Sequence, residues 1–550
     1  MTAPTAASRP RGATPGRGAL LVRNARLVPL DGPPAADADP PVDLRLADGL
    51  VVETGPGLAS RGESELDAAG HWVIPGLWDQ HVHFTQAARA ARWFDLNNCA
   101  SADAVLERVQ AQLAREDAAA GRAGVPGPDG AAPEKPGAQP SARGGANGVL
   151  TGLGYRSNGW PVPASVAALD ALTGDRPVVL ISGDVHNGWL NTAAQRLVGV
   201  GPFEGAIFES EWFAIFDRLG EVPGFASGDE ILRELMASIA ARGVTGVVDV
   251  EFGDAHLVWP GRAERGLDGL RVRTGVYPHQ LADVVASGVR TGDVLGGGGL
   301  VTMGPAKAIT DGSLSTATAW CWQPYAGTVP DAAQPCGAPN FDAAELRELA
   351  ATATRAGLKV AFHGIGDRAC QAVLDAIESA GAHGTVEHAQ LLRWADVPRF
   401  AALGVAASVQ PAHLLDDRDA IDRSWPGRGD RCFAFRSLLD AGAELRFGSD
   451  APVSPIEPWT ASAAAVHRSG DERPGWHPEQ SLTPREALAA SVDGNRLTAG
   501  GRADLVVLGA DPLWQGQTPV ETAAHLRAMP VLATVCAGRV TFAGNSPGVP

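Results

Sequence analysis

Residues 72–83 read Trp-Val-Ile-Pro-Gly-Leu-Trp-Asp-Gln-His-Val-His, an apolar run that ends in two histidines two positions apart. The run predicts a strand over 72–79, with His81 and His83 at its carboxyl end. Side chains at i and i+2 of an extended chain project from one face, so both imidazoles can reach one metal ion. A chain with 13 histidines can also hold such a pair by chance, as a solvated or core pair. Whether the pair binds a metal ion depends on which other side chains the fold places at this strand end.

Strand patterns alternate with helical patterns through the middle of the chain. A helix is predicted over 229–242, and another begins at Asp342, where Glu345 three residues later completes a capping box. Strands are predicted over 72–79, 246–252, 271–277, 306–311, 359–364, 384–389, 405–411 and 444–450. Eight strands alternating with helices predict a (β/α)₈ barrel, and a doubly wound open sheet is the alternative.

The two ends of the chain are rich in short strand patterns and differ from the middle. Residues 19–72 and 500–550 are therefore expected to pair into one small β-domain. The first 18 residues hold three arginines and no acid, a composition that predicts a disordered tail. The predicted barrel spans 73–499 and carries an insertion over 85–227. Within that insertion 118–148 is rich in Ala, Gly and Pro and is predicted to be a flexible loop.

Composition limits the classes of partner. The chain has 550 residues, of which 45% are apolar and 19% charged, and a formal net charge of −17. The apolar share suits a globular core, and the acidic balance argues against a nucleic-acid backbone or an anionic membrane as partner. No apolar run reaches the length of a membrane helix. The six cysteines form no CxxC pair, which predicts free thiols in a reducing compartment, the cytoplasm.

Three further candidate ligands, His363, His388 and Asp450, stand at the carboxyl ends of predicted strands. Each has an ordinary alternative: a hydrogen-bonded structural histidine or, for Asp450 before Ala-Pro, a turn former. In a barrel the carboxyl ends of all strands meet at one face. Together with the pair on the first strand, these groups therefore indicate a metal site, in which Asp450 is a ligand and a general base.

Lys307 lies inside an apolar strand pattern, where a lysine is costly unless it is paired or neutralised. One explanation is an ion pair, with Asp311 or Glu251 as the candidate partner. The other is that the amine reacts with carbon dioxide and gives a carbamate whose two oxygens bridge two metal ions.

Several motifs occur in a fixed order along the chain. They are Pro75-Gly76-x-x-Asp79-x-His81-x-His83, Lys307 with Asp311-Gly312-Ser313, His363-x-Ile365-Gly366-Asp367-Arg368, Glu387-His388-Ala389-Gln390, Gln410-Pro411 and Gly448-Ser449-Asp450. The insertion adds Gly159-Trp160-Pro161 and Asp184-x-His186-x-x-Trp189-x-Asn191. This set resembles the amidohydrolase superfamily, and within it the branch of YtcJ-like proteins and N-substituted formamide deformylases. The chain departs from that pattern at Val185, which stands where the family's Asp-Gly-His has glycine.

The resemblance implies a distorted (β/α)₈ barrel with a small β-sandwich built from both chain ends. It also implies two zinc ions per chain, bridged by a carbamylated lysine. The implied ligands are His81, His83 and Asp450 for one ion, His363 and His388 for the other, and Lys307 between them. Imidazole and carboxylate ligands suit zinc.

Other residues are candidates for supporting roles. His186 is a candidate for binding a substrate carbonyl or oxyanion, and Trp160 and Trp189 for contacting the substrate, with structural roles as the alternative. Asp367 and Glu387 adjoin ligand segments and are expected to accept hydrogen bonds from ligand imidazoles. Helix capping is the alternative for Asp367.

The predicted function is hydrolysis of an amide-type C–N bond, other than a peptide bond, in a small molecule such as an N-substituted formamide. A metal-activated hydroxide attacks the carbonyl, and Asp450 carries the proton to the leaving nitrogen. The alternatives are a deaminase or aminoacylase with one metal ion, or a metal-free binding scaffold. Whether identical chains assemble into an oligomer stays open.

Overall fold

The computed structural model describes residues 19–30, 40–123, 148–157, 160–219, 222, 228–327 and 334–544. The predicted tail over 1–18 lies outside the described residues, as does most of the predicted loop over 118–148. At 118–123 the chain continues helix α2 (Ala102–Ala123), so the loop prediction is wrong there. Four of these six residues are alanine, the strongest helix former.

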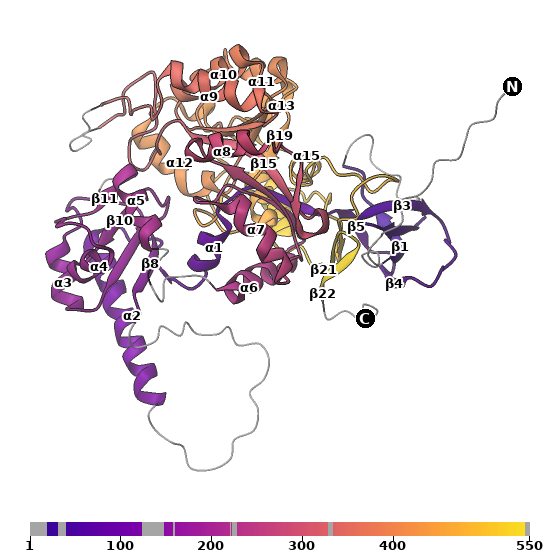
Figure 1. Cartoon of the computed structure of the whole chain (residues 1–550), viewed down its shortest axis with the longest axis horizontal. Coiled ribbons are helices and arrows are strands. Elements are labelled where there is room, and N and C mark those ends of the chain that lie inside the picture. The colour runs from indigo at the N-terminus through magenta and orange to yellow at the C-terminus, as the bar shows by residue number, and fades with distance from the viewer. Residues whose placement is uncertain are drawn as a thin grey trace, which may run out of the picture.

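Eight parallel strands form a barrel at the centre of the molecule (Figure 1). They are β6 (Leu77–Val82), β12 (Val244–Asp249), β13 (Arg271–Val276), β15 (Val301–Ile309), β16 (Val360–Gly364), β17 (Gly384–His388), β18 (Ala406–Val409) and β19 (Leu445–Phe447), with β14 (Val294–Gly296) antiparallel on β15. Each pairs in parallel with the next, and Val82 pairs with Ala451 just beyond β19. This last pair closes the sheet, so the predicted barrel is confirmed and the open doubly wound sheet is excluded.

Helices connect the strands and cover the barrel. They are α1 (Phe84–Ala90), α6 (Asp229–Ala240), α7 (Ala255–Glu264), α8 (Pro278–Ser287), α9 (Ala343–Arg355), α10 (Asp367–Ala380), α11 (Val397–Leu403), α12 (His413–Ser424), α13 (Phe435–Asp440), α14 (Pro458–His467), α15 (Pro484–Ala489) and α16 (Pro519–Arg527). The predicted capping box at the start of α9 is confirmed: Asp342 accepts from the backbone N–H of Ala344 and Glu345, and the Glu345 carboxylate accepts from the N–H of Asp342.

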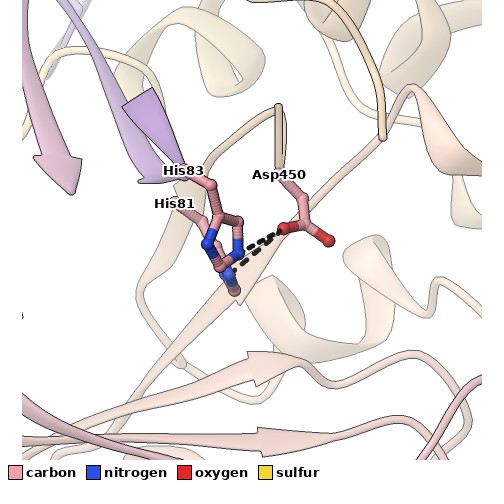
Figure 2. A group of neighbouring side chains, drawn as sticks. All are labelled: His81, His83 and Asp450. Atoms are coloured by element: carbon pink, nitrogen blue, oxygen red, sulfur yellow. Dashed lines mark ion pairs between the residues drawn. The ribbon is translucent and has the colours of Figure 1, made fainter. Parts of the chain in front are cut away.

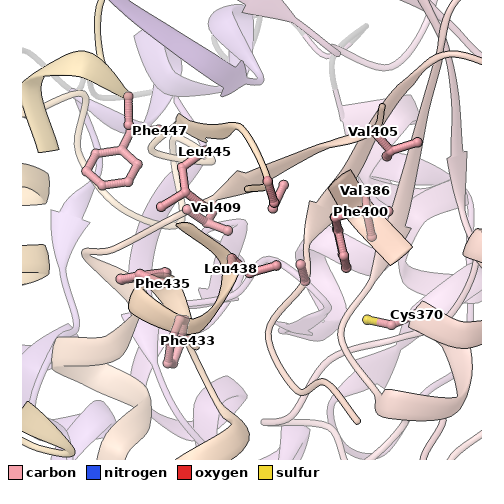
Figure 3. Packing of buried hydrophobic residues seen from close by; sticks show 14 of the residues in the cluster. Cys370, Val386, Phe400, Val405, Val409, Phe433, Phe435, Leu438, Leu445 and Phe447 are labelled. Carbon is pink, nitrogen blue, oxygen red and sulfur yellow. The ribbon is translucent and has the colours of Figure 1, made fainter. Parts of the chain in front are cut away.

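The barrel strands are buried on both faces, which is why they read as continuous apolar runs in the sequence. Figure 3 shows part of the layer between strands and helices, where Phe400 of α11 and Leu438 of α13 lie near Val386 of β17 and Val409 of β18. All four side chains are essentially inaccessible to solvent. This packing holds the strands rigidly, and the strand ends carry the candidate ligands.

Both ends of the chain meet in a second sheet beside the barrel. Its strands are β1 (Leu20–Leu27), β2 (Val42–Ala47), β3 (Leu50–Gly55), β4 (Ser64–Asp67), β5 (Trp72–Pro75), β20 (Leu505–Leu508), β21 (Val531–Cys536) and β22 (Arg539–Ala543). β1 joins its two halves, and both halves contribute to one apolar cluster. The predicted small terminal β-domain is thus present beside the barrel.

The predicted first strand divides at Gly76. Residues before it pair with β20 of the terminal sheet, whereas Leu77 donates its N–H to Gly243 and begins the barrel. A Cβ at Gly76 would stand 2.2 Å from Oγ1 of Thr245, so only glycine fits at this crossing. The apolar pattern continues across the division and does not reveal it.

The insertion forms a third sheet, on the side of the barrel opposite the terminal sheet in Figure 1. The sheet consists of β7 (Phe94–Asp95), β8 (Leu150–Tyr155), β9 (Val178–Ser182), β10 (Asn187–Leu190) and β11 (Ile207–Phe208). The insertion also contains the helices α2, α3 (Val166–Thr173), α4 (Thr192–Val198) and α5 (Glu209–Leu219). The β9–β10 turn reaches the mouth of the barrel. Among the helices that the structure describes, none is long and apolar enough to cross a bilayer. All six cysteines carry free thiols, as predicted.

Candidate metal centre

A cavity opens at the carboxyl ends of the barrel strands and is called the central cavity below. Its lining includes the six side chains predicted as ligands: His81 in β6, His83 after it, Lys307 in β15, His363 in β16, His388 at the end of β17 and Asp450 after β19. The structure thus brings together residues that are up to 369 positions apart in the chain, because every strand delivers its last side chains to the same end of the barrel.

His81, His83 and Asp450 form one compact group (Figure 2). Nε2 of His81 lies 3.3 Å and Nε2 of His83 lies 3.5 Å from the same oxygen, Oδ1 of Asp450. The three ligand atoms lie within 4.8 Å of one another, and all three residues come from the barrel mouth. Two imidazole nitrogens and one carboxylate oxygen are a donor set that suits zinc.

Asp79 ties the two segments of this group together. Its Oδ1 accepts from the backbone N–H of His81 at 3.1 Å and of Ser449 at 2.9 Å. Burial raises the pKa of the Asp79 carboxyl to about 7. A Cβ at Gly448 would stand 2.8 Å from the backbone nitrogen of His81, so glycine permits this close approach. Asp79 therefore positions both the histidine pair and the loop that carries Asp450.

Lys307 is buried beside the first group, with Nζ 3.3 Å from Nε2 of His81. Burial lowers its pKa, and among the residues that the structure describes no carboxylate lies within 4 Å of Nζ. The two carboxylates suggested as its ion-pair partners bind other residues: Asp311 binds His363, and Glu251 binds Gln86. Glu387 and Asp450 are the carboxylates whose charges act on the amine, and neither makes a direct ion pair with it.

The second group of candidate ligands contains one more histidine than predicted. The rings of His363 and His388 lie 4.5 Å apart, but the atoms of His388 and Asp450 also gather with those of His413, at the start of α12. The signal for His413 was available, since it stands two residues after the Gln410-Pro411 motif that follows the strand over 406–409. Burial and the neighbouring His363 hold the pKa of His388 well below its ordinary value, which favours the neutral imidazole that a metal needs.

Three histidines that line the central cavity each have a buried nitrogen with no hydrogen-bond partner within the described part of the chain: Nδ1 of His83, Nδ1 of His388 and Nε2 of His413. Buried polar atoms are nearly always satisfied, so unpaired nitrogens that line a cavity fit a site completed by a cation or a substrate. Together with the mixed imidazole and carboxylate donors, they fit the zinc that the resemblance implies.

Carboxylates behind the cavity orient two of the imidazoles. Glu387 accepts from Nδ1 of His81 at 2.7 Å, the contact that was expected of it. For His363 the acceptor is Asp311, at 2.8 Å from Nδ1, and not Asp367. Asp367 instead accepts from the backbone N–H of Trp322 and from Arg431. The role predicted for Asp367 is therefore corrected, because its side chain turns away from the cavity at the start of α10.

Two candidate ligands have strained backbones. His388 has φ 68° and Asp450 has φ 57°, in the left-handed region that side chains other than glycine rarely adopt. Strain of this kind persists only where the surrounding structure enforces it, and it concentrates at functional sites. In both residues it turns the side chain into the central cavity at the point where the strand ends.

The insertion places a charged histidine over the cavity. Nδ1 of His186 lies 3.0 Å from Oε2 of Glu209. Burial favours the neutral imidazole, but Glu209 and Asp184 outweigh it and raise the pKa of His186 to about 9. Hydroxyl groups of the segment after β15 brace both carboxylates: Ser313 donates to Asp184 at 2.8 Å, and Thr318 to Glu209 at 2.9 Å. His186 is thus a fixed cation in the cavity wall.

The two tryptophans predicted to contact substrate lie elsewhere. Trp189 is fully buried in the apolar core of the insertion, and Trp160 packs on Tyr155 with ring centroids 5.5 Å apart. Neither belongs to the residues that line the central cavity, so this prediction is corrected. Phe252 and Phe213 supply the aromatic wall instead, with Phe252 stacked on His83 at 5.2 Å. Phe252 follows β12 and Phe213 lies within α5, and no motif marked either residue.

A closed barrel with histidine and aspartate donors at its carboxyl face is the architecture of a metal-dependent hydrolase. The model of the amidohydrolase family matches residues 64–542, and the chain belongs to that family. The predicted resemblance is confirmed at this level.

Relatives match most of the chain at 26% identity. They are Protein LONG AFTER FAR-RED 3 of Arabidopsis thaliana (89% of this chain, 87% of the relative), YtcJ of Bacillus subtilis (87% and 90%) and the N-substituted formamide deformylase of Arthrobacter pascens (83% and 87%). The crystal structure of an uncharacterized metal-dependent hydrolase from Pyrococcus horikoshii covers 90% of this chain and 98% of its own, with a TM-score of 0.70 at 22% identity. These matches agree with the barrel and the terminal domain described above.

Proposed function

We propose that this chain is a hydrolase that cleaves an amide-type C–N bond of a small molecule with the help of two zinc ions. One observation carries the proposal: five strands deliver imidazoles, a carboxylate and a buried lysine to one cavity. The relative from Arthrobacter pascens, named as an N-substituted formamide deformylase, supports an amide as the substrate. An N-substituted formamide is therefore the first substrate class to test.

In this proposal His81, His83 and Asp450 hold one zinc ion, and His363 and His388 hold the other. Lys307, as a carbamate, would supply the ligand that both ions share: its neutral amine adds to the carbon of carbon dioxide, an N–C bond forms as one C=O π bond breaks, and one N–H proton is released to water. The composition of the chain supports this role. It contains three lysines among 45 basic residues, and this buried position is one of the three. Arginine cannot take part in this addition because it stays protonated.

Bound zinc supplies a water of lowered pKa and polarises a carbonyl oxygen. The chain's own groups do the rest. Asp450, anionic and aimed into the cavity, accepts the proton of the attacking water and delivers it to the leaving nitrogen. The His186 imidazolium donates a hydrogen bond to the carbonyl oxygen as negative charge develops there. Phe213 and Phe252 hold an apolar substituent of the amide against the wall.

The proposal is tested on wild type and Lys307→Ala. Elemental analysis measures the zinc content of each protein, and hydrolysis of N-benzylformamide measures its activity. Lys359→Ala is the matched control, because Lys359 is exposed and precedes β16 at the other end of the barrel. We expect two zinc ions per chain in wild type and in Lys359→Ala. In Lys307→Ala we expect both the zinc and the activity to be lost. One metal ion that survives Lys307→Ala would contradict the bridged pair and favour the deaminase or aminoacylase. A chain that binds no metal would favour the scaffold.

A further inference from the structure

Val185 has a backbone conformation that its side chain opposes. Its φ is 62°, and among the described residues it is the only β-branched residue with positive φ. Two substituents on Cβ make this region especially unfavourable, so a β-branched residue there is a genuine outlier. An outlier of this kind is a reason to look for a function of the side chain.

The turn between β9 and β10 imposes the conformation. The N–H of Val185 donates to the carbonyl of Ser182 at 3.0 Å, and its own carbonyl accepts from Nε1 of Trp212 at 2.7 Å. The neighbouring Asp184 is held by hydroxyl groups of the segment after β15. A glycine would satisfy the same turn without strain. The turn therefore explains the left-handed backbone but not the presence of valine.

The side chain of Val185 forms part of the wall of the central cavity, next to His186. It is 7% exposed and belongs to an apolar cluster against which Phe213 and Val453 pack. Phe213 and Val453 also line the cavity. The isopropyl group thus forms an apolar part of the cavity wall together with Phe213 and Val453.

We propose that Val185 determines substrate size: its side chain limits the apolar substituent of the amide to a compact group. The proposal rests on the proposed function, since it takes the central cavity as the amide site. In an apolar pocket, a difference of one methylene between two substrates changes their relative kcat/KM by about 10- to 200-fold. The methyl groups of the pocket wall set how large a substituent fits. A role of the valine side chain in limiting substrate size would explain why this strained position holds valine and not glycine.

The test compares Val185→Ala and Val185→Gly with wild type in their zinc-loaded forms. The readouts are the melting temperature, the kcat/KM for N-benzylformamide and N-(1-naphthylmethyl)formamide, and the dissociation constants of both compounds by calorimetry. Ala317→Gly is the control, because Ala317 has φ 58° but does not line the cavity. Val185→Ala loses the isopropyl group but keeps the Cβ and the strain that a Cβ causes at positive φ, whereas Val185→Gly loses both.

Both Val185 variants are expected to improve the naphthyl compound relative to the benzyl compound by at least about tenfold. Val185→Gly should also melt about 2 °C above Val185→Ala, the reverse of the ordinary order, because glycine relieves the left-handed strain. Ala317→Gly should leave the preference unchanged. An unchanged preference in both Val185 variants would overturn the proposal.

Failure of the proposed function gives a different result. If no variant hydrolyses either formamide, the amide assignment fails while the ratio of dissociation constants still tests Val185. If neither compound binds any variant, the assignment of the apolar wall to a substrate group is itself overturned.

Discussion

Asp311→Asn changes a single atom behind the metal centre and has a calculable effect. The Asp311 carboxylate is completely buried. Oδ1 accepts from Nδ1 of His363 at 2.8 Å and the N–H of Ile365 at 3.2 Å, and Oδ2 accepts from the N–H of Gly366 and of Trp320, both at 2.9 Å. The asparagine keeps the shape, but its amide nitrogen faces two N–H groups whichever way it turns.

Two hydrogen bonds to a charged acceptor are therefore lost. Each is worth about 1.5–3 kcal/mol, so we expect the free energy of unfolding to fall by about 3–6 kcal/mol. The neutral amide is also a weaker acceptor for Nδ1 of His363 than the carboxylate, and loss of such a partner typically weakens metal binding about 10- to 100-fold. The zinc ion assigned to His363 and His388 should be released first.

Urea unfolding measures the first effect, and competition with a chelator of known zinc affinity measures the second. Asp367→Asn is the matched control: that carboxylate is also buried, but it binds Trp322 and Arg431 and no imidazole. It should lose stability and keep its zinc affinity. The reasoning would be refuted by wild-type zinc affinity in Asp311→Asn, or by an equal loss of affinity in both variants.

Three further outcomes are expected. The pKa of His186 in the folded chain is raised to about 9, so protonation of His186 should stabilise the folded chain by about 3 kcal/mol relative to His186→Asn. This stabilisation should be complete below about pH 6.5 and disappear as pH rises through about 9. Urea unfolding of both proteins across this pH range measures it. Gly366→Ala places a Cβ 2.1 Å from the carbonyl oxygen of Trp320 and should lower the melting temperature by several degrees, whereas Gly228→Ala, with no atom within 4 Å, should not. Chelation should lower the melting temperature of wild type and added zinc restore it, because the ion binds only the folded chain; no shift in either direction would speak against a resident metal.

Much of the architecture is readable in the sequence because strand ends and apolar runs are local features. The run at 359–364 predicts β16, and the structure places its boundary within one residue. His363 and His388 close their strands in the sequence, and they meet with ring centroids 4.5 Å apart in the structure. The capping box at Asp342 is equally local. Each of these inferences needs the chemistry of a few consecutive residues and the rule that barrel strands present their carboxyl ends together.

The carboxylates and aromatic rings around the site were harder to predict. Asp311 and Asp367 each stand close to a ligand segment along the chain, and only the packing of the segment after β15 against the end of β16 turns Asp311 toward the imidazole. Trp189 has a large aromatic side chain of the kind that often lines a pocket, but it lies in the apolar core of the insertion. Phe252 lines the cavity without a motif around it, whereas His413 stands two residues after the Gln410-Pro411 motif and was overlooked.

The sequence by itself determined the barrel, the terminal domain and the candidate ligands, because periodicity, strand ends and motif order are properties of the chain. Only the tertiary structure decided which carboxylate orients which imidazole, that Lys307 has no carboxylate partner among the described residues, and that the insertion brings His186 and Val185 over the cavity. These facts depend on contacts between segments that are from 52 to more than 300 residues apart, or on the direction in which a loop turns its side chains. Neither is encoded in any short stretch of sequence.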